Sequence, residues 1–249
     1  MDTAITPDDA IPEAQSDKSS YFKIIWNTFF APFKAFKALE HKPRWLIPYI
    51  ISIVVVFTSL ALTGGTKMED IKADLRSDPS LTQPEVERRI ANIDAQKTQG
   101  ISWAHIRLGV VAVTVIQTIK LFGLALIFWL ALHLVKTSIS FKKTLAVCSF
   151  AFLILIPEAL IKIPLILVKG TTYIYLGPAI LLPGEWKYSP LFNLFEKLDV
   201  FSIWMAIILI IGFSVLLNIS RRKSAITVGY LWGIWLLIGM FFGNLIQIN

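Results

Sequence analysis

The chain has 249 residues, of which 55% are hydrophobic and 16% are charged, and its formal net charge is +7. Soluble domains usually carry about 25% charged residues, so this composition argues against an ordinary soluble domain and indicates a protein of the lipid bilayer. The basic residues lie between apolar segments rather than in one stripe, which is typical of membrane flanks and argues against a nucleic-acid partner.

Residues 1–20 form an acidic segment with few large apolar side chains. This composition predicts a disordered tail, and the early acidic residues argue against a signal peptide. In residues 21–44, aromatic side chains such as Trp26 and Phe33 recur at helical spacing beside several lysines. The pattern predicts an amphipathic interfacial segment, interrupted near Pro32, whose apolar face lies either on an anionic membrane surface or on the protein's own helices.

The apolar segments that follow are long enough to cross a hydrocarbon core of ~30 Å. They predict an all-α membrane domain over residues 45–249, with a hydrophilic helical insert at 66–104. We expect the first span to end at Gly64 and Gly65, and the insert to form a hairpin of helices that start near Thr66 and Thr82. The five expected transmembrane helices are 45–63, a segment within 107–135, 145–168, 201–219 and 225–246.

The segment 169–190 is rich in glycine, proline and aromatic residues, and its apolar pieces are too short to cross a membrane. We expect it to form an interfacial or re-entrant loop. Leu191, Leu194 and Leu198 then recur at helical spacing among polar residues, which predicts an amphipathic lead-in helix before the fourth span.

Charge asymmetry predicts how the helices are oriented in the membrane. The basic segments within 18–44, 136–143 and 221–223 alternate along the chain with connections of mixed charge. By the positive-inside rule, this alternation places the N-terminus in the cytoplasm and the C-terminus outside. We therefore expect a multi-pass protein of the cytoplasmic (inner) cell membrane, with the lipid bilayer as its main partner.

The third span carries two ionisable side chains, Glu158 and Lys162, one helical turn apart and flanked by Pro157 and Pro164. This spacing places the carboxylate and the ammonium on one helix face, in the favourable order for an ion pair. We expect the two prolines to bend the helix, because each removes a backbone hydrogen bond. Ionisable residues within a membrane span are candidates for function by default.

The second span supplies Gln117 and Lys120. If spans two and three form an antiparallel hairpin that turns near Ile139, Lys120 lies at the depth of Glu158. We therefore expect an intramembrane network of Gln117, Lys120, Glu158 and Lys162, with a Lys120–Glu158 contact at its centre. Either this network clamps two helices together, or it lines a polar cavity that binds an ion, a proton or a lipid head group.

The fifth span contains two pairs of small residues, Gly229 with Gly233 and Gly239 with Gly243, whose spacing predicts close helix approach. The motifs of enzymes are missing from the sequence: there is no Ser–His–Asp arrangement, Cys/His cluster, HExxH motif or glycine-rich phosphate loop. We therefore expect no enzymatic activity, no cofactor and no metal site.

Three segments, at residues 29–50, 198–216 and 219–235, resemble the prokaryotic branch of the Yip1 family. The resemblance implies five helices and a cytoplasmic N-terminus. Eukaryotic relatives are trafficking proteins that associate with prenylated Rab GTPases and with one another, but their DLYGP-type motif has only Leu176-Gly177-Pro178 as its nearest match here.

The resemblance implies a membrane-organising or protein-interaction role, with other membrane proteins or further copies of the chain as partners. The alternative that the residues themselves offer is a small transporter, or a lipid- or ion-binding protein, built on the intramembrane lysine and glutamate residues.

Overall fold

The computed structural model describes residues 17–78, 80–98, 103–134, 139–183, 186 and 189–247, and these residues form helices and connections without strands. The all-α prediction is therefore confirmed. Residues 1–16 of the expected acidic tail lie outside the described residues. The first helix, α1 (Asp17–Phe30), begins before the boundary that was placed at residue 20.

Within the described part of the chain, four helical units are long and apolar enough to cross a membrane, and a fifth arises if a bent pair counts as one span. The bent pair is α8 (Pro190–Lys197) with α9 (Val200–Leu216), whose axes differ by 57°. The expected lead-in helix corresponds to α8. The four other units are α3 (Leu46–Ser77), α5 (Trp103–His133), α6 (Phe141–Ala151) continued by η1 (Phe152–Ile154) and α7 (Leu155–Lys169), and α10 (Arg221–Gln247).

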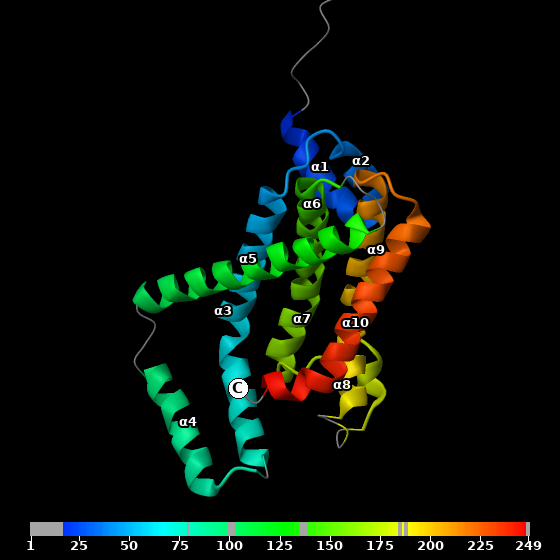
Figure 1. Ribbon diagram of the computed structural model, residues 1–249. Helices are drawn as coiled ribbons and strands as arrows, with labels where there is room; N and C mark the ends of the chain where they lie inside the picture. The colour runs from blue at the N-terminus through cyan, green and yellow to red at the C-terminus, as the bar shows by residue number, and fades with distance from the viewer. Residues whose placement is uncertain are drawn as a thin grey trace, which may run out of the picture.

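The helix α5 lies across the bundle, whereas α3, the α6–η1–α7 unit, α9 and α10 run side by side (Figure 1). The expected antiparallel hairpin of spans two and three is therefore wrong in its geometry. The buried side chains of α5 form one narrow stripe, which comprises Val113, Gln117, Leu121, Ala125, Phe128 and Leu132. Through this stripe α5 contacts α3, α6 and α10 in turn rather than running alongside a single neighbour.

Three helices pack closely where α2 (Pro32–Ala38), α6 and α9 meet. Gly212 on α9 makes this approach possible. A Cβ atom at Gly212 would lie 2.6 Å from Cγ1 of Val147 and 2.8 Å from Cζ of Phe36, both closer than van der Waals contact. An added methyl group at Gly212 would therefore overpack the contact between these three helices.

The expectation that the first span ends at Gly64 and Gly65 is wrong, because α3 continues without a break to Ser77. A glycine inside a helix costs only about 1 kcal/mol relative to alanine. The following turns of α3 pack against α4 (Gln83–Thr98), where the buried Lys72 ammonium pairs with Asp94. The hairpin of the insert therefore exists, but its first arm is an extension of the first span.

The third span changes to a 3₁₀ turn at η1, immediately before α7. Pro157 accounts for this position, because its ring clashes with the carbonyl of Leu153 four residues earlier and its nitrogen carries no hydrogen. Pro164 lies inside α7, and the helix continues past it. Of the two prolines expected to bend the span, Pro157 is thus the one beside an irregular turn.

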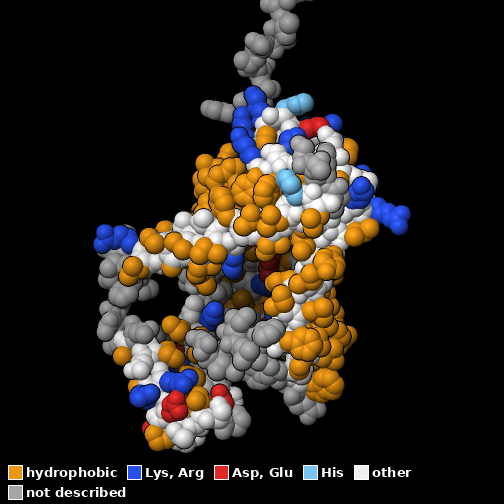
Figure 2. Space-filling view, in the orientation of Figure 1, with side chains coloured by type: hydrophobic (Ala, Val, Ile, Leu, Met, Phe, Trp, Pro, Cys, Tyr) orange, Lys and Arg blue, Asp and Glu red, His pale blue; other side chains and the backbone are white. Residues whose placement is uncertain are grey.

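The described residues of the basic segments gather at one end of the bundle, at the top of Figures 1 and 2. The Arg221 guanidinium lies 5.8 Å from the ring centroid of Phe33. The pKa of the Glu40 carboxyl lies below its usual value, chiefly because it accepts a hydrogen bond from Lys37, with a smaller attraction from Lys143. This arrangement agrees with the charge pattern, and the cytoplasmic location of that end stays a prediction.

The close approach at Gly212 generates a testable expectation. Gly212→Ala should lower the free energy of unfolding by about 1–3 kcal/mol, because the added methyl group overpacks the contact with Val147 and Phe36. Thermal unfolding of the protein in detergent measures the effect. Gly233→Ala is the matched control, since a Cβ there meets no described atom within 4 Å. Equal effects of the two substitutions would contradict the assignment.

Candidate functional site

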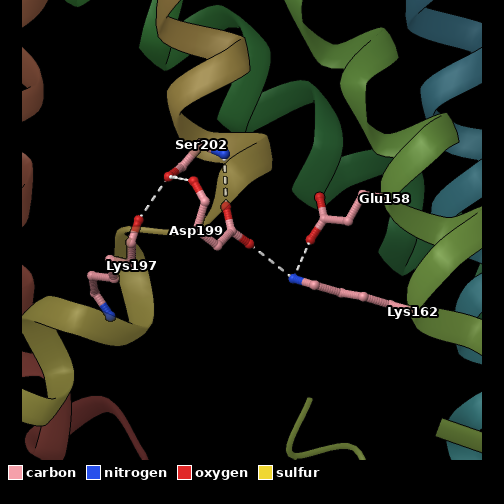
Figure 3. Close-up of polar contacts among 5 residues, drawn as sticks. All are labelled: Glu158, Lys162, Lys197, Asp199 and Ser202. Atoms are coloured by element: carbon pink, nitrogen blue, oxygen red, sulfur yellow. Dashed lines mark hydrogen bonds and ion pairs between the residues drawn. The ribbon is translucent and has the colours of Figure 1, made fainter. Parts of the chain in front are cut away.

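An ammonium that bridges two carboxylates connects α7 to the bend between α8 and α9. The Lys162 Nζ lies 2.6 Å from Oε1 of Glu158 and 3.0 Å from Oδ2 of Asp199 (Figure 3). The three side chains are about three-quarters or more buried, so water screens the attraction only in part. The expected pairing of Glu158 with Lys162 is present, and Asp199 joins it.

Asp199 has a second role, because it caps the N-terminus of α9. Its Oδ1 accepts a hydrogen bond of 2.7 Å from the backbone N–H of Ser202. The Ser202 hydroxyl in turn lies 2.8 Å from the carbonyl oxygen of Lys197 and 2.9 Å from that of Asp199 (Figure 3). One carboxylate thus satisfies a free helix N–H and fixes the α8–α9 bend to α7.

The loop after α7 presses against the same bend at Gly177. A Cβ atom on Gly177 would lie 2.3 Å from the carbonyl oxygen of Leu198 and 3.1 Å from the Cα of Asp199. Since these are backbone atoms, they have no side-chain rotation with which to move aside. The absence of a side chain at Gly177 therefore permits the position that Asp199 occupies.

The start of this loop is anchored to α3. Gly170 ends α7 with φ of 67°, in the left-handed region that favours glycine. Thr171 and Thr172 then donate hydrogen bonds to the Asp70 carboxylate, including 2.6 Å from the Thr172 backbone nitrogen. The Tyr173 hydroxyl donates to Asp74. The expected interfacial loop is therefore held on the hydrophilic extension of the first span.

A cavity of about 330 Å³ adjoins these contacts. Figure 2 shows a hollow below α5 in which Lys, Arg, Asp or Glu side chains lie within a largely hydrophobic face. Along α9, polar wall residues stand at the α8 end and apolar residues such as Met205 stand further into the bundle. The polar residues of the wall include Gln117, Lys120, Glu158, Glu196, Lys197 and Asp199.

The structure thus brings the expected polar residues to one place, but in a different pairing. Gln117, Lys120 and Glu158 line the cavity, and Lys162 forms an ion pair with Glu158 outside the cavity wall. Among the residues that the structure describes, Lys120 forms no ion pair, so the expected Lys120–Glu158 contact is not made. Lys162 takes the carboxylate instead, since it lies one turn away on the same helix.

Several polar groups at the cavity lack internal partners. The Gln117 side chain is buried, and its Nε2 has no hydrogen-bond partner within the described part of the chain. Lys120 and Glu196 form no ion pair there, and the Lys197 Nζ lies 5.9 Å from the ring centroid of Trp235. Of these side chains only Gln117 is buried, and because a buried amide is usually satisfied, its Nε2 calls for a ligand or for water.

The family model of the Yip1 domain matches residues 26–243. The chain belongs to the Yip1 family. Proteins of the Yip1 family are generally non-enzymatic membrane proteins, and the apolar helices agree with a multi-pass integral membrane protein of this kind. Neither the curated proteins nor the solved structures contain a match.

In this Yip1 chain, the glycines of α10 behave differently from one another. A Cβ at Gly229 or Gly233 meets no described atom within 4 Å, so this pair permits no close approach inside the chain. A Cβ at Gly239 would overlap the Lys197 side chain, 2.2 Å from its Cε. The surroundings of Gly243 lie outside the described side chains. Association of another helix with Gly229 and Gly233 stays a prediction.

Sequence reasoning on this Yip1 chain missed Asp199, Glu196 and Lys197. A signal for Asp199 was present, since an acidic residue directly before an apolar run is a common helix N-cap. The bend that brings α8 beside α10 has no comparable signal in the sequence. Among the described residues, no group of three His, Cys, Asp or Glu side chains is arranged to hold a metal ion.

The two roles of Asp199 can be separated by substitution. Asp199→Asn keeps a cap for Ser202 but removes the ion pair with Lys162, so it should lower the free energy of unfolding by about 1 kcal/mol. Asp199→Ala removes both contacts and should cost about 1 kcal/mol more. Thermal unfolding in detergent checks the order of the two variants. Equal stability of Asp199→Ala and the unsubstituted protein would show that the bridge contributes nothing.

Proposed function

We propose that this Yip1-family protein is a non-enzymatic, membrane-organising protein of the cytoplasmic membrane, acting through the segment α1–α2. The observation that carries the proposal is a row of exposed aromatic side chains on α1. Phe22, Trp26 and Phe30 are 72%, 56% and 66% exposed, respectively, and lie one helical turn apart. The ring centroids are 6.5 Å apart for the first pair and 4.8 Å apart for the second.

The opposite face of the segment is fixed to the bundle. Ile24, Thr28, Ala35 and Phe36 are buried, and α2 packs on α9. The bundle thus accounts for one of the two expected surroundings of this segment, and we propose lipid for the face that stays exposed. A helix that is held on its own bundle and still exposes a row of rings is suited to insertion at the boundary between head groups and acyl chains.

Charge supports a lipid surface as the partner of this face. Lys23, Lys34 and Lys37 are exposed beside the aromatic row. Lysines near a cytoplasmic leaflet gain about 1 kcal/mol each from anionic lipid, and aromatic rings favour the membrane interface. A segment anchored in only one leaflet expands that leaflet, and its binding is sensitive to curvature. We therefore expect α1–α2 to organise the membrane by expanding one leaflet locally.

The proposal predicts enrichment of the protein on curved membrane. We expect full-length protein in giant vesicles with anionic lipid to concentrate in narrow tubes drawn from them. Replacing both Trp26 and Phe30 by Ser should abolish the enrichment, because each exposed ring contributes about 2 kcal/mol when buried in lipid.

Phe241→Ser is the control in the same assay, since Phe241 is also exposed but lies on α10. Fluorescence of labelled protein in tube and vesicle gives the ratio. Equal ratios for the double variant and the unsubstituted protein would contradict the proposal.

A second candidate function is the binding of a lipid or an ion at the cavity, alone or as part of transport. The specific observation in its favour is the set of unpartnered polar groups around Lys120 and Gln117. A clamp between helices alone would not need these groups to face a cavity. The two functions use opposite regions of the molecule and do not exclude each other.

A further inference from the structure

We propose that the cavity binds the phosphate-bearing head group of a phospholipid, with Lys120 and Lys197 on the phosphate and the Gln117 amide beside it. This inference rests on the second candidate function and names its ligand. The cavity is bounded by α5, α7, α9, α10 and the α8–α9 bend, so its charged groups come from separate parts of the chain.

The charged side chains at the cavity balance, since Lys120, Lys197 and Lys162 stand against Glu158, Glu196 and Asp199. Such a site suits a ligand that carries an anionic group together with a cationic or hydrogen-donating one. Lys162 is engaged by Glu158 and Asp199, whereas Lys120 and Lys197 have no carboxylate within ion-pair distance among the described residues. These two lysines are therefore the cations left for a phosphate, whose oxygens accept charge-assisted hydrogen bonds from them.

The buried amide of Gln117 makes this a built site rather than a pair of surface lysines. Gln117 is only 4% exposed, lines the cavity and has an unpartnered Nε2 in the described structure. An unsatisfied buried donor costs about 1–3 kcal/mol, which a ligand acceptor would recover. A phosphate ester supplies such acceptors beside the lysine contacts.

The shape of the cavity indicates an amphiphile. Its apolar wall includes Phe152, Leu155 and Met205, of which Met205 lies further along α9 than the N-cap Asp199. The hollow in Figure 2 opens on the hydrophobic face of the bundle. A volume of about 330 Å³ holds a head group rather than a whole lipid, so the acyl chains would extend outward along that face.

Glu196 adds a preference within the phospholipids. Its carboxylate has no ion pair among the described residues and shares the cavity with the two lysines. A head group that carries an amine or hydroxyl groups beyond its phosphate would satisfy Glu196 as a donor. Phosphatidylethanolamine offers the amine, and phosphatidylglycerol offers the hydroxyl groups.

Binding to purified, delipidated full-length protein tests the inference. The probes are short-chain phosphatidylethanolamine and phosphatidylglycerol, the diacylglycerol with the same chains, and inorganic phosphate, each measured by titration calorimetry. We expect Lys120→Gln and Lys197→Gln each to weaken phospholipid binding about tenfold or more, which corresponds to one charged hydrogen bond. Gln117→Met should weaken it less, because a neutral contact is lost.

Lys169→Gln is the matched control, since it removes the same charge from the end of α7 outside the cavity wall. It should leave binding unchanged. Equal binding by Lys120→Gln and Lys169→Gln would identify annular lipid and overturn the inference. Binding of the diacylglycerol as tight as that of the phospholipids would overturn it as well. So would binding of inorganic phosphate that is equally tight and depends equally on Lys120, because the acyl chains would then contribute nothing.

The failure of this inference can be told apart from the failure of the function beneath it. A response to sodium ions or to a fatty acid that depends on Lys120, without a response to phospholipid, would overturn the phosphate assignment and leave lipid or ion binding in place. No response to any of these probes would overturn both.

Discussion

The Lys162 ammonium, held between the carboxylates of Glu158 and Asp199, is the contact on which the polar half of the molecule depends. It joins α7 to a bend in the chain, and the 57° angle between α8 and α9 exists at that bend. Because Asp199 also caps α9, one side chain connects the bridge to the start of that helix. Gly177 completes the arrangement by letting the preceding loop approach the backbone of the bend.

This bend connects the two regions for which we propose a function. The N-terminus of α9 lies at the cavity, and further along the helix Gly212 approaches Phe36 of α2 closely. The interfacial segment and the charged cavity therefore both contact α9, at opposite ends of that helix. Tight packing fixes the end with the basic connections, whereas incompletely paired charges surround the cavity.

The long-range arrangement was less predictable from sequence than the elements. Apolar runs predicted the spans, because length and polarity decide membrane insertion. The spacing of Glu158 and Lys162 predicted their pairing, because it is local to one helix. The crossing of α5 could not be predicted, since its buried stripe is visible only once the partner helices are placed. The bridging role of Asp199 and the close approaches at Gly177 and Gly212 could not be predicted either, because they too depend on how the helices pack against one another.

The most direct test of the account is water access to Lys120, because an open, charged cavity is its central claim. In a Cys148→Ser background, Lys120→Cys is treated with a membrane-impermeant thiol reagent from each side of the membrane, with Lys142→Cys marking the basic end. Cys148 itself is fully buried, so the unsubstituted protein shows the background. The account predicts labelling of position 120 from the side opposite Lys142. Protection from both sides, in correctly inserted protein, would contradict an open cavity and leave a buried clamp.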